Sequence, residues 1–298
     1  MLFVGEIAAL TGSALWGISS HLYGTVVREL SPTKMNLIKN VFAAACFGLV
    51  CFLFRISPSG LGWHEAGALL LSGVIGIGLG DTVWFLSLRF LPVHSVLVIG
   101  TLSPIISAVL AWLTIGELLS ISSWLCMAIT VAGIALVVSE SQKRAADARF
   151  SSSMRLAGIG LVVLAVVLGA VSNVITRSVF VVAEVSPFWS GFLRLFAGSV
   201  VAFFSVAFMR VKRGAQPRVS LGLYGRLLGG ASLGTVVGIF CQQTAFQHTS
   251  VGVAQALMSV TPVFSIVFAI ATGKRPSRRS LFGSLIATVG VVGLVVGV

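Results

Sequence analysis

The carboxylate best placed for chemistry in this sequence is Asp81, because it lies deep inside an apolar segment. Ionisable side chains inside membrane-spanning segments are costly, and they usually mark a functional site. Trp84 and Phe85 follow at i+3 and i+4, on the same face of a helix. A carboxylate beside two aromatic rings suits a cationic ligand through charge and cation–π attraction. The alternatives are reversible protonation of Asp81, a structural ion pair with Arg89 two turns away, and a helix end at the membrane interface.

Two cations, Lys39 and Arg194, occupy equivalent places in two related apolar segments. They suit recognition of a carboxylate or phosphate, for which arginine offers two parallel donors. The structural alternative is that they extend to the membrane interface or pair with Asp81. His94 and His21 are candidate proton carriers, although a histidine near the end of a span also serves as an ordinary interface residue.

Further polar and aromatic candidates lie in other apolar segments. Gln242 and Gln243 fall on Trp84 and Phe85 when the two halves of the chain are aligned, so we expect these pairs to face one cavity. Such amides also bridge helices, with a gain of about 1 kcal/mol. Three more residues are candidates to line the same cavity: Trp16, Asn173 and Gln255. The Trp16 ring suits either stacking on a ligand or packing between helices.

Several other chemistries have no signature in the sequence. There is no GxxxxGK[ST] motif for ATP, no HExxH and no GxSxG. The cysteines lie in apolar runs without CxxC spacing or neighbouring histidines, as is typical of buried thiols: Cys46, Cys51, Cys126 and Cys241. We therefore expect no enzyme activity, no metal site and no cofactor.

The elements that carry these residues are predicted to cross a membrane. Apolar residues make up 57% of the 298-residue chain and charged residues 9%, against roughly 25% charged residues in soluble domains. Mean hydropathy is +1.05, so most of the surface must contact lipid. The net charge of +12 then reflects topology and anionic lipid, and a nucleic-acid partner is not expected because no water-facing domain is present.

A membrane helix needs about 20 apolar residues. The sequence predicts an all-α integral membrane protein with ten transmembrane helices, and the first apolar segment is expected to be retained as a helix because it lacks a signal-peptide pattern. The predicted spans are residues 6–27, 36–54, 66–88, 93–115, 122–139, 156–176, 188–209, 227–247, 250–272 and 280–298.

The spans form two related halves, residues 1–140 and 156–298, joined by a basic linker at 141–155. At a nearly constant offset, Ser103-Pro104 matches Thr261-Pro262 and Ser31-Pro32 matches Ser186-Pro187. Each half has an odd number of spans, so the two five-helix repeats must be inverted. Small-residue ladders also repeat and are expected to permit close packing between the third and eighth helices: Ser72, Gly76 and Gly80 in one, Gly230, Gly234 and Gly238 in the other.

Basic residues are concentrated in the loops on one side of the predicted bundle. The opposite side carries only Arg55 and Arg177. Because basic loops stay in the cytoplasm, this bias places both termini on the non-cytoplasmic side.

The ordered motifs resemble the EamA-type drug/metabolite transporter superfamily over nearly the whole chain. They are Leu15-Trp16-Gly17, Ser31-Pro32, Ser103-Pro104, Gly116-Glu117 and Gly133, with Ser186-Pro187, Arg194, Thr261-Pro262 and Gly290 in the second half. The resemblance implies a ten-helix secondary transporter, often an exporter of amino acids or related metabolites, as in YddG-type exporters. Two features depart from it: Gly273-Lys274-Arg275 replaces the second Gly-Glu, and family members commonly place both termini in the cytoplasm.

These observations predict a secondary transporter that exports a small polar metabolite by alternating access through a central cavity between the repeats. The alternatives are a membrane enzyme acting on a lipid-linked substrate and a passive channel. The expected partners are a small-molecule substrate and the lipid of a bacterial inner membrane, with a monomer as the expected state.

Overall fold

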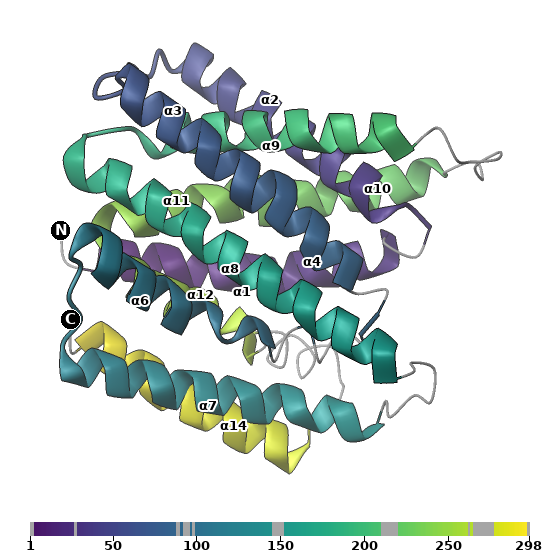
Figure 1. Cartoon of the computed structure of the whole chain (residues 1–298), viewed down its shortest axis with the longest axis vertical. Helices are drawn as coiled ribbons and strands as arrows, with labels where there is room; N and C mark the ends of the chain where they lie inside the picture. Colours follow the sequence, from purple (N-terminus) through teal and green to yellow (C-terminus); the bar gives the residue numbers. More distant parts are fainter. Residues whose placement is uncertain are drawn as a thin grey trace.

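The computed structural model describes residues 3–26, 29–87, 90–91, 96, 99–144, 152–209, 220–261, 263–264 and 277–296. In these residues all regular secondary structure is helical, and it forms ten helices when each π-helical segment is joined to its neighbours (Figure 1). The elements are α1 (Val4–Val26), α2 (Pro32–Leu53), α3 (Trp63–Ser72), η1 (Gly73–Gly80), α4 (Asp81–Ser87), α6 (Ser103–Ile115), α7 (Ile121–Arg144), α8 (Ser152–Val182), α9 (Pro187–Met209), α10 (Leu221–Gly230), η3 (Ala231–Val237), α11 (Gly238–His248), α12 (Val251–Met258) and α14 (Arg278–Val296).

The predicted all-α membrane architecture is confirmed. Among the described residues, five helices are both long and apolar enough to cross a membrane: Pro32–Leu53, Trp63–Ser87, Arg155–Val182, Pro187–Phe208 and Leu221–His248. Shorter apolar helices occupy Ser103–Ile115, Ile121–Val137 and Leu281–Val296. Helix α7 continues to Arg144 and α8 begins at Ser152, so both ends of the predicted 141–155 linker are helical.

Prolines and a glycine mark several helix ends. Pro32 opens α2 after an extended Ser31, and Pro187 opens α9, as expected for a residue that lacks an amide donor but has a helical φ. Gly116 ends α6 with φ of +67°, a left-handed conformation that glycine adopts without steric cost. The turn at Gly116 directs Glu117 back toward the bundle.

The third and eighth spans share a feature that hydropathy does not predict. Each has a π-helical middle, η1 in the third span and η3 in the eighth. Gly73 and Ala231, where these segments begin, are equivalent in the sequence repeat, so the two wide turns are a repeated feature of the fold. π-helical segments are rare and occur often at functional sites.

The helices pair across the two repeats. Helix α2 packs against α9, α6 against α12, and α7 against α14 at one edge of the bundle (Figure 1). The third span packs on α8, and the eighth span packs on α1 in the equivalent way. This exchange of partners is the two-fold arrangement of inverted repeats, with α1 starting and α14 ending on the same side of the molecule.

The small-residue ladders do allow close packing, but the prediction that they pack on each other is wrong. A Cβ on Gly76 would collide with Ser172 of α8, and one on Gly234 with Ser19 of α1. Each ladder thus faces the first helix of the other repeat. The inverted symmetry explains this, because it places the first and third helices of opposite repeats side by side.

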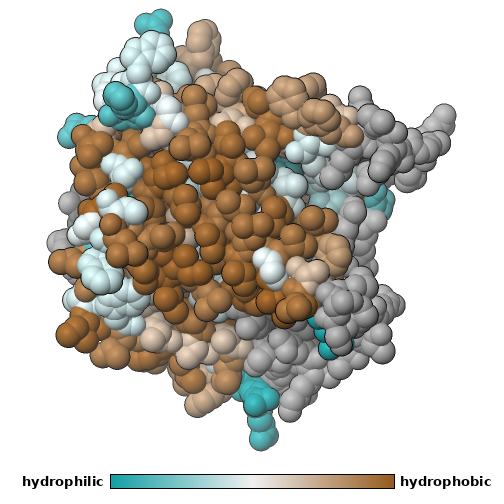
Figure 2. Space-filling model, viewed as in Figure 1, coloured by the Kyte–Doolittle hydropathy of each residue, from teal (hydrophilic) through white to brown (hydrophobic). Residues whose placement is uncertain are grey.

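The outer surface is apolar over wide areas. Figure 2 shows a continuous hydrophobic expanse on one face, with polar residues gathered toward its margins. Large exposed apolar side chains include Phe52, Leu156, Phe203, Phe208 and Phe282. The interior instead holds buried polar residues such as Asn36, Lys39, Arg194 and Gln243, an arrangement suited to a lipid environment around a polar interior.

Candidate functional site

A cavity of about 290 Å³ lies between the two repeats. Its walls come from α1, η1, α4, α6, α8 and α12, together with Gly100. The residues that line it are Trp16, Gly76, Gly80, Asp81, Trp84, Gly100, Ser103, Ala165, Val166, Gly169, Gln255, Met258 and Ser259. Four of the residues singled out in the sequence, Trp16, Asp81, Trp84 and Gln255, therefore share one cavity.

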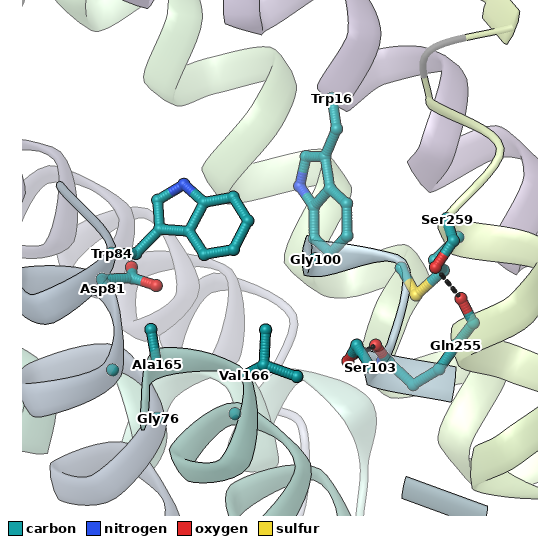
Figure 3. A pocket seen from close by; sticks show the side chains of 13 residues that line it. Trp16, Gly76, Asp81, Trp84, Gly100, Ser103, Ala165, Val166, Gln255 and Ser259 are labelled. Carbon is teal, nitrogen blue, oxygen red and sulfur yellow. Dashed lines mark hydrogen bonds between the residues drawn. The ribbon is translucent and has the colours of Figure 1, made fainter. Parts of the chain in front are cut away.

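One end of the cavity combines a carboxylate with the Trp84 indole, and the Trp16 indole lies farther along the same wall. Asp81 begins α4 directly after the π-helical segment, and its side chain is 40% exposed. The rings of Trp84 and Trp16 lie along one side, with Ala165 and Val166 opposite them (Figure 3). Such a pocket provides negative charge and aromatic faces, the combination that binds organic cations.

The other end is polar and neutral. Ser103 Oγ donates to Gln255 Oε1 at 3.3 Å, and Ser259 Oγ donates to the Gln255 carbonyl at 2.7 Å. The Gln255 side-chain nitrogen is buried and has no hydrogen-bond partner among the described residues.

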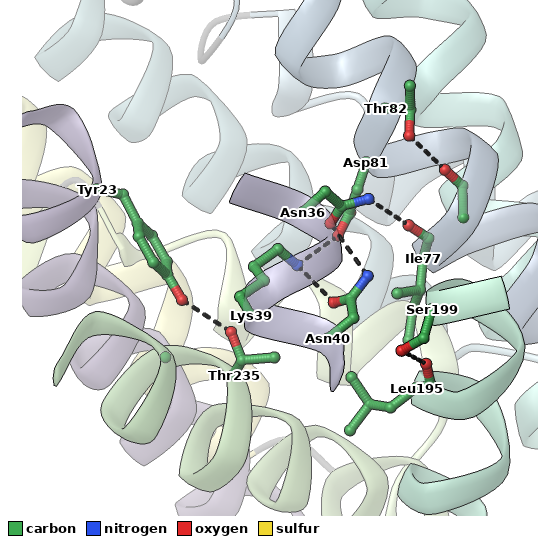
Figure 4. Close-up of polar contacts among 12 residues, drawn as sticks. Tyr23, Asn36, Lys39, Asn40, Ile77, Asp81, Thr82, Leu195, Ser199 and Thr235 are labelled. Carbon is green, nitrogen blue, oxygen red and sulfur yellow. Dashed lines mark hydrogen bonds and ion pairs between the residues drawn. The ribbon is translucent and has the colours of Figure 1, made fainter. Parts of the chain in front are cut away.

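Behind Asp81 lies a chain of buried polar contacts (Figure 4). Lys39 Nζ contacts Asp81 Oδ2 at 2.9 Å and donates to Asn40 Oδ1 at 3.0 Å. Asn40 Nδ2 donates to Asn36 Oδ1, and Asn36 Nδ2 donates to the Ile77 carbonyl, both at 3.2 Å. The acid in the cavity is thereby connected to α2 and to the backbone of η1.

Lys39 and Arg194 hold equivalent positions in the two repeats but have different environments. Of the two alternatives for Lys39, the structure has the ion pair with Asp81. Arg194 is 2% exposed, and its Nη2 donates to Ser172 Oγ at 3.2 Å. Its Nε and Nη1 have no partner among the described residues, and Arg194 does not line the cavity.

The remaining candidates that the structure describes do not line the cavity. Phe85 packs against an apolar cluster that includes Met35. Gln243 is fully buried and accepts a hydrogen bond from Ser190 Oγ at 2.8 Å. Two further candidates, Asn173 and Gln242, are buried without lining the cavity. His94, Arg89 and the side chain of His21 fall outside the described residues.

Trp16 connects the cavity with the second π-helical segment. Its Nε1 donates to the Gly234 carbonyl of η3 at 2.6 Å, and a Cβ on Gly238 would lie 2.5 Å from that same nitrogen. The indole can sit against the helix only because glycine occupies these positions. Both π-helical segments therefore contact the cavity, η1 directly and η3 through Trp16.

Sequence reasoning missed an ion pair on the side where the termini lie. Arg177 Nε contacts Glu117 Oε1 at 2.9 Å, and its Nη1 donates to the carbonyls of Phe246 at 2.7 Å and Gln247 at 3.2 Å. The second Glu117 oxygen accepts from the Val251 amide at 2.9 Å. We call these residues the Glu117–Arg177 clamp. The Gly116-Glu117 motif was the available signal, but the partner of Glu117 is distant in sequence.

Comparison with known proteins gives the family. The model of the EamA-like transporter family matches residues 3–139 and 156–296. The chain belongs to the EamA-like transporter family. Its EamA halves correspond to the two inverted repeats, and the cavity lies between them. This protein is accordingly a multi-pass membrane transporter and not an enzyme.

Solved structures share the fold. One of them, described only as the crystal structure of a protein, has a TM-score of 0.78 and 14% sequence identity, and the match covers 98% of this chain and 96% of that chain. At this identity the likeness concerns the fold alone. Comparison with curated proteins finds no match.

Proposed function

We propose that this EamA-like transporter exports a small metabolite with a protonated amine, an amino acid or a related compound, across a bacterial inner membrane. The observation that carries the proposal is the Asp81 carboxylate, which is partly exposed beside Trp84 in a cavity between the repeats that Trp16 also lines (Figure 3). Alternating access around such a site follows the general logic of inverted-repeat transporters.

The dimensions and the second end of the cavity favour an amino-acid-like compound. Its volume of about 290 Å³ is at the small end of ligand pockets, which span roughly 300–1,000 Å³. An ammonium group at Asp81 leaves the polar end of the cavity, formed by Ser103 and Gln255, for a second polar group of the ligand. The apolar part of the ligand then lies between the indoles and Val166.

Packing and charge together support the direction of transport. The Glu117–Arg177 clamp joins α8, α11 and α12 on the side of the termini, and there Trp189 Nε1 also donates to the Ile56 carbonyl at 3.0 Å. Asp81 and Trp84 lie in the last turns of the third span, toward the side of the basic loops. Because basic loops stay in the cytoplasm, this arrangement favours loading of the cavity from the cytoplasm.

A thermal-shift screen of the purified protein tests the substrate class. Amino acids, primary amines, carboxylic acids and nucleosides are added singly, since a ligand that binds only the folded state raises Tm. We expect stabilisation by compounds with a primary amine and none by carboxylic acids without one. Asp81→Asn must abolish the stabilisation, with monodisperse elution as its folding control, because the buried Lys39 loses its partner and the Tm of the ligand-free variant falls. Stabilisation by acids alone, or an unchanged response of Asp81→Asn, would contradict the proposal.

A further inference from the structure

Lys39 contacts the carboxylate that the substrate's amine is proposed to bind. Its side chain is 7% exposed whereas that of Asp81 is 40% exposed, so the carboxylate lies between the lysine and the cavity. The lysine ammonium contacts Oδ2, and Oδ1 accepts no hydrogen bond from the described residues. Within the part of the chain that the structure describes, one carboxylate oxygen of Asp81 is thus held by Lys39, the other has no donor, and the side chain lines the cavity.

A substrate ammonium that reached the second oxygen would lie close to Lys39. Two like charges on one carboxylate repel each other, and the repulsion is stronger in a site partly removed from water. The carboxylate has two oxygens and can accept from more than one donor, but it neutralises only one of the two positive charges. Binding of a cationic group in the cavity must therefore weaken the contact between Lys39 and Asp81.

The lysine also links this contact to a π-helical segment. The ammonium donates to Asn40, Asn40 donates to Asn36, and Asn36 holds the Ile77 carbonyl within η1. A movement of Lys39 away from Asp81 is transmitted along this chain to the backbone of the third span. Charge in the cavity and the conformation of η1 are in this way physically connected.

We propose that Lys39 is a built-in competitor that the substrate's ammonium displaces from Asp81, and that its displacement loosens the Asn36–Asn40 contact with η1. The inference rests on the proposed function. It assigns Lys39 a positioning role without contact to the substrate. The lysine lowers the affinity of the cavity for the substrate and couples substrate binding to movement of the third span.

Calorimetric titration of the purified full-length protein with tryptamine, a primary amine with one ring system, tests this role. Lys39→Gln removes the competing charge and should bind tryptamine about tenfold more tightly than wild type. Lys39→Arg keeps the charge and should retain the wild-type affinity, whereas Asp81→Asn should lose binding. A purely structural lysine predicts the opposite sign for Lys39→Gln, because the carboxylate would lose its support.

Transport gives the second readout. In proteoliposomes, Lys39→Gln should show a lower maximal rate of tryptamine exchange despite its tighter binding, and Lys39→Arg should restore the rate. Monodisperse elution and a Tm near that of wild type serve as folding controls. If Lys39→Gln misfolds, Lys39→Met provides a second variant without the positive charge.

The outcomes separate the two proposals. Equal or weaker binding by the neutral variants, with binding still lost in Asp81→Asn, would overturn the competitor role and leave the proposed substrate class intact. Absence of tryptamine binding in wild type and in every Lys39 variant would overturn the amine specificity, and the competitor role with it.

Discussion

At the residue scale, the chemistry of the cavity depends on Asp81 being paired with a buried lysine on one side and open to the cavity on the other. One oxygen pairs with Lys39, and the side chain remains partly open to the cavity beside Trp84. If the carboxylate were fully paired and buried, neither of its oxygens could bind a ligand. A fully exposed one would be screened by water, which weakens its attraction for a cation.

Gly100 controls the position of one aromatic wall. A Cβ on Gly100 would lie 2.8 Å from the Trp84 ring, so we predict that Gly100→Ala pushes the indole into the cavity and weakens amine binding several-fold. Gly67→Ala serves as the matched control, because a Cβ at Gly67 meets nothing within 4 Å. Calorimetric titration measures both variants, and unchanged affinity in Gly100→Ala would mean that Trp84 does not contact the ligand.

The sequence predicted Asp81, Trp84, Trp16 and Gln255 as cavity residues, since each interrupts an apolar segment with charge, a ring or an amide. It could not separate Trp84 from Phe85. Positions i+3 and i+4 lie about 100° apart on a helix, on opposite sides of the line through Asp81. Only the placement of neighbouring helices decides that the tryptophan lines the cavity and that Phe85 packs in an apolar cluster.

At the scale of elements, the Glu117–Arg177 clamp holds together the ends of several helices. Both side chains are mostly buried, at 14% and 16% exposure, and a hydrogen bond to a charged group contributes roughly 1.5–3 kcal/mol. We predict that Glu117→Gln lowers Tm clearly. Arg177→Gln should cost more, because it also removes the bonds to the Phe246 and Gln247 carbonyls.

A double-mutant cycle distinguishes coupling from independent effects. The Glu117→Gln/Arg177→Gln variant should lose less stability than the sum of the two single variants, because the pair is already broken by either change. Strict additivity in thermal unfolding would show that the two residues do not act together.

Close packing of the π-helical segments gives a second prediction at this scale. Gly234→Ala in η3 brings a methyl group against Ser19, with its Cβ at 2.7 Å, and overpacking of this kind costs roughly 1–3 kcal/mol. Gly160→Ala on α8 meets nothing within 4 Å and should leave Tm unchanged. Equal Tm values for the two variants would contradict the close approach of α1 and η3.

Helix positions were predictable because hydropathy and proline report directly on burial in lipid and on missing amide donors. The predicted spans beginning near Pro32 and Pro187 agree with α2 and α9 within a few residues. The π-helical segments were not predictable from hydropathy, because an extra residue in a turn leaves the apolar composition unchanged. The only sequence signal in these segments was the repeated glycine spacing, which indicates that another helix packs closely on Gly76 and Gly234.

At the scale of the whole molecule, inverted symmetry explains why Gln242 and Gln243 do not share the cavity with Trp84. The symmetry maps residues on one side of the membrane midplane to the other side. In this state the cavity extends to Asp81 and Trp84, and the symmetric region around Gln243 is packed. The sequence repeat identified the equivalent residues correctly but carried no information about which side of the bundle is open.

Labelling of single cysteines tests the proposed orientation. In a protein whose four native cysteines are replaced, a membrane-impermeant maleimide should label Ser59→Cys in intact cells, because Ser59 is exposed in the loop between α2 and α3. Ala146→Cys in the basic linker should react only after the membrane is opened. The reverse pattern would place the termini in the cytoplasm and contradict loading of the cavity from that side.

Transport of an amine, through a cavity in which Asp81 binds the positive charge, is the proposed function of this EamA-like protein. Counterflow in proteoliposomes tests it most directly: vesicles loaded with unlabelled tryptamine are diluted into a trace of labelled tryptamine. Wild type should accumulate the label transiently, and Asp81→Asn should not, although it reconstitutes equally well. Accumulation by Asp81→Asn at the wild-type rate, or no counterflow by wild type, would contradict the account.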